Sequence, residues 1–128
     1  MSSPCNAIVH ILESQDSKEV TANEAFDRLD TLMNGTLDLA LPSDADHTLS
    51  TSPGGESDFF RLNITGTTTA DRAIILSRKH QLILKNSTTG GHNLVVKMAT
   101  GATVTVANGA SHLLYCTGAA VIDIATLP

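Results

Sequence analysis

Few residues in this chain have types and spacing that could support chemistry. Asp44-Ala45-Asp46-His47 places two carboxylates and an imidazole within four residues, and such oxygen and nitrogen groups can bind a divalent cation. The glycine and the distal glutamate of a calcium loop are missing, which favours a solvated acidic loop and no metal site. Ser111 and His112 are neighbours, and neighbouring strand residues point to opposite faces, so they cannot form a nucleophile–base pair.

The remaining candidates are isolated residues. His80 and His92 could bind a metal or sense pH on a threefold axis, but ordinary strand-end histidines explain them better. Cys5 and Cys116 lie far apart without a CxxC, which argues against zinc; a buried thiol is favoured, and an intermolecular disulfide stays open. Three segments fit a glycosylation pattern that means little without a secretory signal: 34–36, 63–65 and 86–88. We therefore predict no catalytic residues, no cofactor and no enzymatic activity.

Length and composition exclude several classes of protein. The 128 residues suit one compact domain. The net charge of −5, the scattered lysines and arginines and the 3% aromatic content argue against nucleic-acid binding. No apolar run approaches the roughly 20 residues that span a bilayer. The first residues do not read as a signal peptide, so we expect synthesis in the cytoplasm and no membrane partner.

The elements that would position these residues begin with a helix near the N-terminus. Thr21 and Glu24 fit a capping box, in which each side chain accepts a hydrogen bond from the other residue's amide. Apolar residues then recur at helical spacing, which predicts a helix from about Ala22 to Met33. Asn34-Gly35 should end it, because glycine accepts the left-handed conformation common at helix C-termini.

The rest of the chain reads as strands and turns. The segment 42–56 is polar and predicts a long surface loop. Eight short apolar runs predict strands at 37–41, 59–64, 73–76, 82–84, 94–98, 102–106, 112–116 and 120–124. We expect a mainly β fold, an antiparallel sandwich, jelly-roll or barrel-like domain of about eight strands with one short N-terminal α-helix. Residues 1–36 would form a docking arm and capped helix, and residues 37–128 the β-domain.

A weak internal similarity relates two of these strands. The segment 80–85, HQLILK, matches the segment 92–97, HNLVVK, twelve residues later. Two successive strands of a meander explain the match better than a solenoid repeat, because no third copy follows.

Two segments resemble bacteriophage virion proteins. Gln15 to Asp30 is similar to a Q-x-x-K-x-V-T-x-N-E-A-x-x-x-L-D segment near the start of many phage and prophage virion proteins. Leu94 to Gly118 is similar to a strand-turn-strand ending common in phage fibre and head-decoration proteins, although this chain has Cys116-Thr117 where those relatives usually carry an acidic turn. The matches cover about a third of the chain, and neither motif is catalytic.

The resemblance implies a structural subunit of the virion, most simply a capsid decoration or cement protein. It would form a homotrimer and dock on the major capsid protein or on tail proteins. A tail fibre base or head–tail adaptor is one alternative, and a glycan-binding β-sandwich module is another, although few aromatic residues are available to stack on sugars. The residues that we expect to dock on the partner are apolar: Ile8, Val9, Ile11, Leu12, Phe26 and Leu29.

Overall fold

The fold is mainly β, with one α-helix. The computed structural model describes residue 9, residues 16–52 and residues 54–128. In these residues the helix α1 (Lys18–Asn34) precedes nine strands and one short 3-10 helix, η1 (Glu56–Asp58). The strands are β1 (Thr36–Ala40), β2 (His47–Thr48), β3 (Arg61–Thr65), β4 (Arg72–Ile75), β5 (His80–Asn86), β6 (Leu94–Lys97), β7 (Val104–Val106), β8 (Ser111–Cys116) and β9 (Val121–Leu127). All eight predicted strands are confirmed, with shifts of a few residues at their ends.

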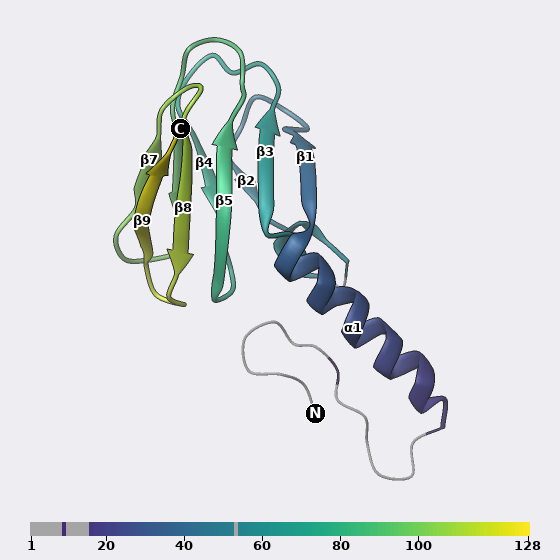
Figure 1. The fold of residues 1–128 in the computed structure, drawn as a ribbon. Coiled ribbons are helices and arrows are strands. Elements are labelled where there is room, and N and C mark those ends of the chain that lie inside the picture. Colours follow the sequence, from purple (N-terminus) through teal and green to yellow (C-terminus); the bar gives the residue numbers. More distant parts are fainter. Residues whose placement is uncertain (1–8, 10–15, 53) are drawn as a thin grey trace.

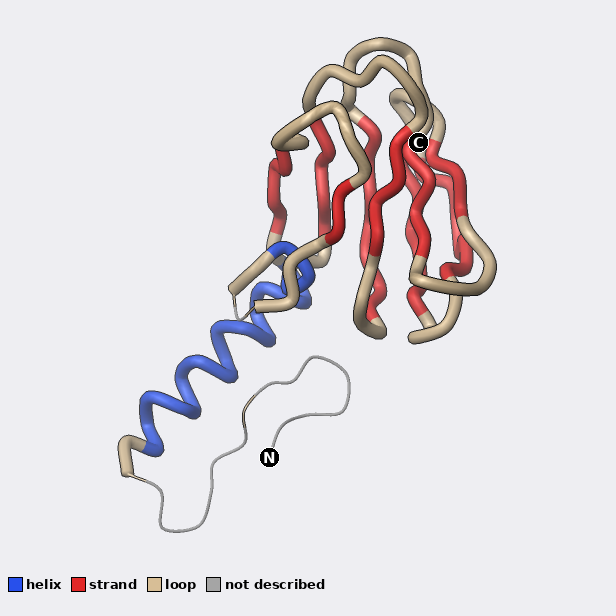
Figure 2. Tube along the Cα trace, turned by 180° about the vertical axis from the view of Figure 1, so that it is seen from behind, coloured by secondary structure: helices blue, strands red, loops and turns tan. Residues whose placement is uncertain are grey.

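The strands form two sheets that face each other. One sheet has the order β1-β3-β5-β8-β9, and the other has the order β2-β4-β6-β7. The five-stranded sheet lies toward the viewer in Figure 1, and α1 runs away from the lower end of the β-domain. Seen from behind, the strands of both sheets stand side by side above the helix (Figure 2). The helix is therefore the part of the described chain that extends furthest from the two sheets.

The first six strands wind in parallel, which corrects the prediction of an antiparallel domain. The chain alternates between the sheets, so β1, β3 and β5 stack in parallel in one sheet and β2, β4 and β6 stack in parallel in the other. The step from Arg61 to its partner Ile83 is 22 residues, and so is the step from Arg72 to Leu94. The antiparallel pairs among the described strands are β6 with β7, β5 with β8 and β8 with β9. The molecule is thus a short parallel winding closed by an antiparallel end.

This winding also corrects the interpretation of the internal similarity. The two matching segments are β5 and β6, which lie in different sheets, so they are not adjacent strands of a meander. The twelve residues between equivalent positions of β5 and β6 take the chain from one sheet to the other. The spacing that places residues side by side is the 22-residue step, which also aligns Thr67 with Thr89 at a corner, where their hydroxyls lie 2.9 Å apart.

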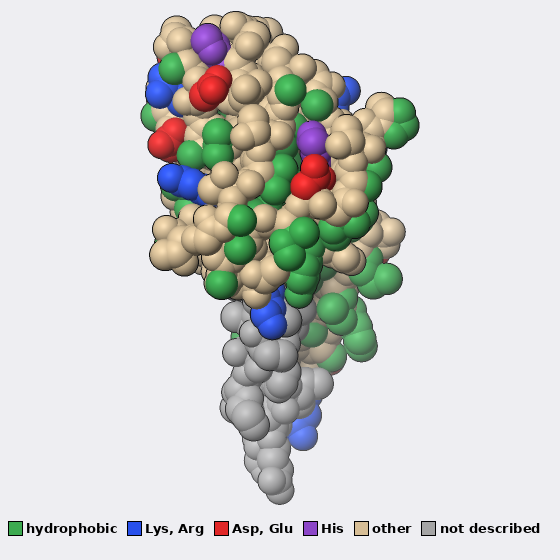
Figure 3. Space-filling model, turned by 90° about the vertical axis from the view of Figure 1, so that its left-hand side faces the viewer, with side chains coloured by type: hydrophobic (Ala, Val, Ile, Leu, Met, Phe, Trp, Pro, Cys, Tyr) green, Lys and Arg blue, Asp and Glu red, His purple; other side chains and the backbone are tan. Residues whose placement is uncertain are grey.

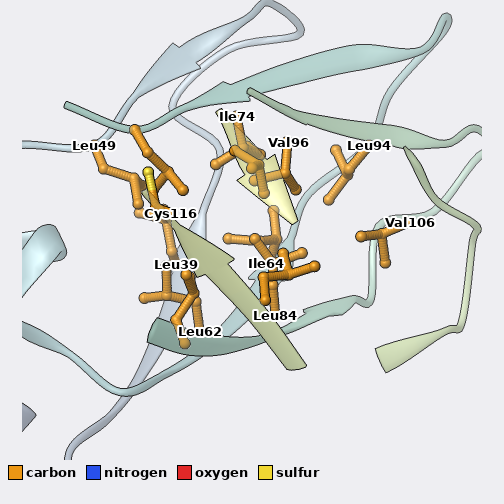
Figure 4. Close-up of a cluster of buried hydrophobic side chains, with 14 of the residues drawn as sticks. Leu39, Leu49, Leu62, Ile64, Ile74, Leu84, Leu94, Val96, Val106 and Cys116 are labelled. Atoms are coloured by element: carbon orange, nitrogen blue, oxygen red, sulfur yellow. The ribbon is translucent and has the colours of Figure 1, made fainter. Parts of the chain in front are cut away.

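The core fills the space between the two sheets. Figure 4 shows Ile74 and Val96 from the four-stranded sheet opposite Leu62, Ile64 and Leu84 from the five-stranded sheet. All five are fully buried. Because alternate residues of a strand point to opposite faces, each strand of the winding contributes the same face to this core. Burial of each such side chain contributes roughly 1.5–3 kcal/mol.

The segment 42–56 does more than form a surface loop. It contains β2, which pairs in parallel with β4, and the side chain of Leu49 after it is 1% exposed. The backbone amide of Leu49 donates to the carbonyl of Ile75, 2.9 Å away. The prediction of a surface loop missed this strand because only one large apolar residue marks it.

The helix begins earlier than its predicted start. It runs from Lys18, with Ser17 as the N-cap residue, so Thr21 and Glu24 lie inside the helix and the predicted capping box is wrong. The amide of Thr21 already donates to the carbonyl of Ser17. The predicted C-terminus is confirmed within one residue.

The reason given for Gly35 is also wrong. Its φ is −68°, so it does not use the left-handed conformation. A Cβ at this position would lie 2.6 Å from the carbonyl oxygen of Thr31 and 3.0 Å from the ring of Phe59. Glycine is needed here because the chain turns tightly from α1 into β1, and a side chain would not fit.

Two glycines at the antiparallel end give a matched test of space against backbone conformation. Gly101 and Gly109 have φ near +85° and +83°, but a Cβ on Gly101 would lie 2.2 Å from the carbonyl oxygen of Ala119, while nothing lies within 4 Å at Gly109. We expect Gly109→Ala to cost about 1–2 kcal/mol from left-handed strain. Gly101→Ala should cost about 1–3 kcal/mol more, from the added overlap. Urea unfolding of both variants measures the difference, and equal losses would contradict the role assigned to Ala119.

Candidate functional site

A buried ion-pair cluster anchors α1 to the β-domain. The guanidinium of Arg28 donates two hydrogen bonds to the carboxylate of Asp58, from Nε at 2.9 Å and from Nη2 at 2.8 Å. Arg78 approaches the same carboxylate at 3.2 Å, and the amide of Gly54 donates to it at 2.8 Å. The Asp58 side chain is only 1% exposed. Arg28 is the buried residue of α1, so this cluster is the point at which the helix is anchored to the β-domain.

The ionisation of Asp58 reflects two opposing effects. Burial alone would raise the pKa of this carboxyl, because a charge is poorly solvated in the interior. The hydrogen bonds from Arg28 and Gly54, and the positive charges of Arg28 and Arg78, outweigh burial and leave the pKa below its ordinary value. Asp58 is therefore ionised at neutral pH and paired with two arginines.

The acidic segment 44–47 does not bring its side chains together. Asp44 accepts hydrogen bonds from the backbone and hydroxyl of Thr69 and from Arg72, whose Nε lies 2.8 Å away. Hydrogen bonds from Arg72 and Thr69 hold the pKa of Asp44 well below its usual range. Asp46 accepts from the amide of Ala73, and the Nε2 of His47 lies 3.0 Å from both carboxylate oxygens of Glu56. These contacts tie neighbouring windings of the chain to each other.

A histidine–carboxylate pair links the last two strands. The Nδ1 of His112 lies 3.1 Å from the carboxylate of Asp123, and the hydroxyl of Thr126 lies 3.5 Å from the same nitrogen. His112 faces inward and Ser111 is on the opposite face of β8, as their adjacency predicts. This pair therefore joins β8 to β9 near the open edge of the sheet. His92 was considered above as a metal-binding or pH-sensing residue. Its Nδ1 lies 3.7 Å from the carboxylate of Asp71.

A groove of about 370 Å³ separates α1 from the lower ends of β5 and β8. Its walls are lined by Leu29, Leu32, Met33, Lys79, His80, Gln81 and Tyr115. The His80 side chain is buried. Burial lowers the pKa of His80, so the ring is neutral at neutral pH. The groove thus combines an apolar helix face with a buried, neutral imidazole ring.

The helix exposes the apolar face that borders this groove. Phe26 is 66% exposed and Met33 is 69% exposed, and Leu29 is 44% exposed between them. An isolated helix of this length is marginal in water, because most helical stability in proteins comes from packing an amphipathic face. Within the described residues, α1 contacts the rest of the chain mainly at η1, where Arg28 pairs with Asp58. The part of the chain that the structure describes therefore leaves the apolar face of α1 largely exposed.

The predicted docking residues fall into two groups. Phe26 and Leu29 lie on this exposed face, and Val9 is 57% exposed. Ile8, Ile11 and Leu12 lie outside the described residues. Cys116 is buried and its thiol is free, and burial raises its pKa, while Cys5 also lies outside the described residues.

Comparison of the chain with protein-family models, with curated proteins and with solved structures finds no match. The residues that the structure describes hold no group of three or more histidines, cysteines, aspartates or glutamates placed to bind a metal ion. In the same part of the chain, no helix combines the length and the hydropathy needed to cross a membrane.

Sequence reasoning missed the pairing of Arg28 with Asp58. The two residues are 30 positions apart, and each resembles an ordinary surface charge when its neighbours alone are considered. The one available signal was the position of Arg28 beside the apolar stripe of the helix, where a charged side chain must find a partner if it is buried.

Proposed function

We propose that this chain is a structural subunit of a bacteriophage particle, a decoration or cement protein that docks on the capsid lattice through its N-terminal segment and α1. The observation that carries the proposal is the projecting helix, whose apolar face stays exposed among the residues that the structure describes. The resemblance of the segment 15–30 to phage virion proteins supports the same assignment, since residues 18–30 of that segment are the first part of α1. We propose a trimer as the form that docks.

The energy of such docking depends on repetition. Each apolar anchor that is fully buried against a partner contributes roughly 1.5–3 kcal/mol. Phe26, Leu29 and Met33 together suffice for a weak individual contact. A trimer that presents three such helices converts weak contacts into tight binding, because the second and third contacts form within one complex.

Removal of one anchor tests the proposal. We expect Phe26→Ser to weaken binding of the purified protein to particles made without this chain by at least about tenfold, since a buried aromatic is lost from each contact. Cosedimentation with the particles measures the binding. Val20→Ser is the matched control, because Val20 is 50% exposed on the side of the helix opposite Leu29.

Mass spectrometry of purified particles, with heads and tails separated, locates the chain. Detection in heads supports the decoration role. Detection only in tails would replace it with the fibre-base or adaptor role. Absence of the chain from both fractions, or equal binding of Phe26→Ser and Val20→Ser, would overturn the docking proposal.

A further inference from the structure

The helix α1 takes no part in the hydrophobic core of the β-domain. Among the described residues, the side chains of that core come from the strands and the loops between them, and the one buried residue of α1 is Arg28. The groove of about 370 Å³ separates the side of α1 that carries Leu29 and Met33 from the ends of β5 and β8. Figure 3 shows hydrophobic side chains exposed below the β-domain, in the part of the molecule where α1 projects. The core of the β-domain is therefore built without side chains from α1.

The covalent connection between α1 and the β-domain is a single residue. Gly35 lies between the last residue of α1 and the first residue of β1. Its amide donates to the carbonyl of Thr31 at 2.7 Å, and its carbonyl accepts from the amide of Arg61 at 3.0 Å. Glycine can change φ and ψ more freely than any other residue, and hinges are often a few positions at the end of an element. We call Gly35 the joint.

The second attachment is the Arg28–Asp58 pair, which we call the latch. Arg28 lies about two turns of helix before the joint. On the other side of the latch, the Asp58 carboxylate also accepts from the amide of Gly54 at 2.8 Å and approaches Arg78 at 3.2 Å. Both of these partners belong to the β-domain. The bonds that cross from α1 can therefore open while the carboxylate keeps a positive charge and a hydrogen-bond donor beside it.

We propose that α1 is a hinged arm, which the latch holds in place and which swings about the joint when the latch opens, while the β-domain stays folded. Regions with few buried apolar contacts open at a lower free energy than the core of the same protein. The helix has 17 residues, and a helix of this length is marginal in water without packing. An open latch therefore also lets part of α1 lose its helical hydrogen bonds.

The inference deepens the proposed function in one respect, and that respect rests on it. A hinged arm lets Phe26 and Leu29 turn to meet their site on the particle, while the β-domain keeps its own position. The latch limits this motion in the free protein and so reduces the entropy that docking must remove. The hinge itself does not depend on the particle, so the isolated chain is enough to test it.

Hydrogen exchange of backbone amides measures the opening of the arm. In the wild type, we expect the amides of α1 near Arg28 to be protected but to exchange through an opening that leaves β5 and β8 closed. Low concentrations of urea should speed exchange in β5 and β8 more than in α1, because opening of the arm exposes little new surface.

Two substitutions on the same helix form a matched pair. Arg28→Met removes the latch from the side of α1 and keeps a residue of similar helix propensity. We expect it to speed exchange in α1 by at least about tenfold and to leave β5 and β8 within about threefold of the wild type. Lys18→Met removes the same charge from an exposed position in the first turn and should stay within about threefold everywhere. Arg28→Lys, which keeps the charge but not the two-bond geometry, should speed α1 to a smaller extent if Arg28→Met does not fold.

The outcomes separate the hinged arm from the docking proposal. Faster exchange confined to α1 in Arg28→Met supports the inference, whether or not the chain binds particles. The inference is overturned if α1 is unprotected in the wild type, if Arg28→Met leaves α1 unchanged, or if the variant speeds α1 and the core strands by the same factor. Failure of particle binding by a chain whose α1 opens separately overturns only the proposed function.

Discussion

The variant Asp58→Asn is expected to lose about 3–5 kcal/mol of unfolding free energy, because it removes the buried carboxylate charge that pairs with Arg28 and Arg78. The loss should be large because the Asp58 side chain is only 1% exposed and joins α1, η1 and Arg78. Urea unfolding followed by circular dichroism measures it. Asp38→Asn makes the same chemical change at an exposed site of the five-stranded sheet and should stay within about 0.5 kcal/mol of the wild type.

The same cluster predicts the direction of a pH dependence. Because the folded-state pKa of Asp58 lies below its ordinary value, the stability that its ionised form contributes is fully present above the ordinary aspartate pKa of about 3.9. This contribution is lost as the pH falls through the lowered pKa of the folded state. The difference in stability between wild type and Asp58→Asn should therefore shrink in strongly acidic solution. A difference that is unchanged at low pH, or absent at neutral pH, would contradict the role assigned to Asp58.

The variant Asn86→Ala should also be strongly destabilised, by about 3–5 kcal/mol, because it leaves several buried backbone groups without partners. The side-chain amide of Asn86 donates to the carbonyl oxygens of His92 and Val106, at 3.1 and 3.0 Å. Its carbonyl oxygen accepts from the amide and the hydroxyl of Thr88. Asn86 is fully buried at the end of β5, so water cannot replace these bonds.

Asn93→Ala serves as the control, since Asn93 is half-buried on the neighbouring loop and contributes its backbone amide, not its side chain, to the bond with Asp71. Equilibrium unfolding in urea compares the two variants. We expect the loss at Asn86 to exceed the loss at Asn93 by at least about 2 kcal/mol. Similar losses would show that the backbone alone holds the corner after β5.

The sequence alone determined where most elements lie. Helical spacing of apolar residues predicted α1, and alternation of β-branched residues with turn signals predicted eight of the nine strands. These patterns are local: they depend on residues within one element, and they record which side of that element faces the core. The reliance on local patterns also explains the error at the start of the helix. A capping motif at Thr21 is compatible with a helix that starts there, but residues 18–20 before it can also be helical, and the structure shows that they are.

The tertiary structure decided how the strands pair. Alternation gives the buried side of a strand but not its neighbour, so β5 and β6 read as successive strands of a meander, although their parallel partners, β3 and β4, lie 22 residues earlier in the chain. The pairing of Arg28 with Asp58 and the corner held by Asn86 depend in the same way on residues distant in the sequence. Contacts between distant residues arise from the winding of the whole chain, and no local pattern encodes them.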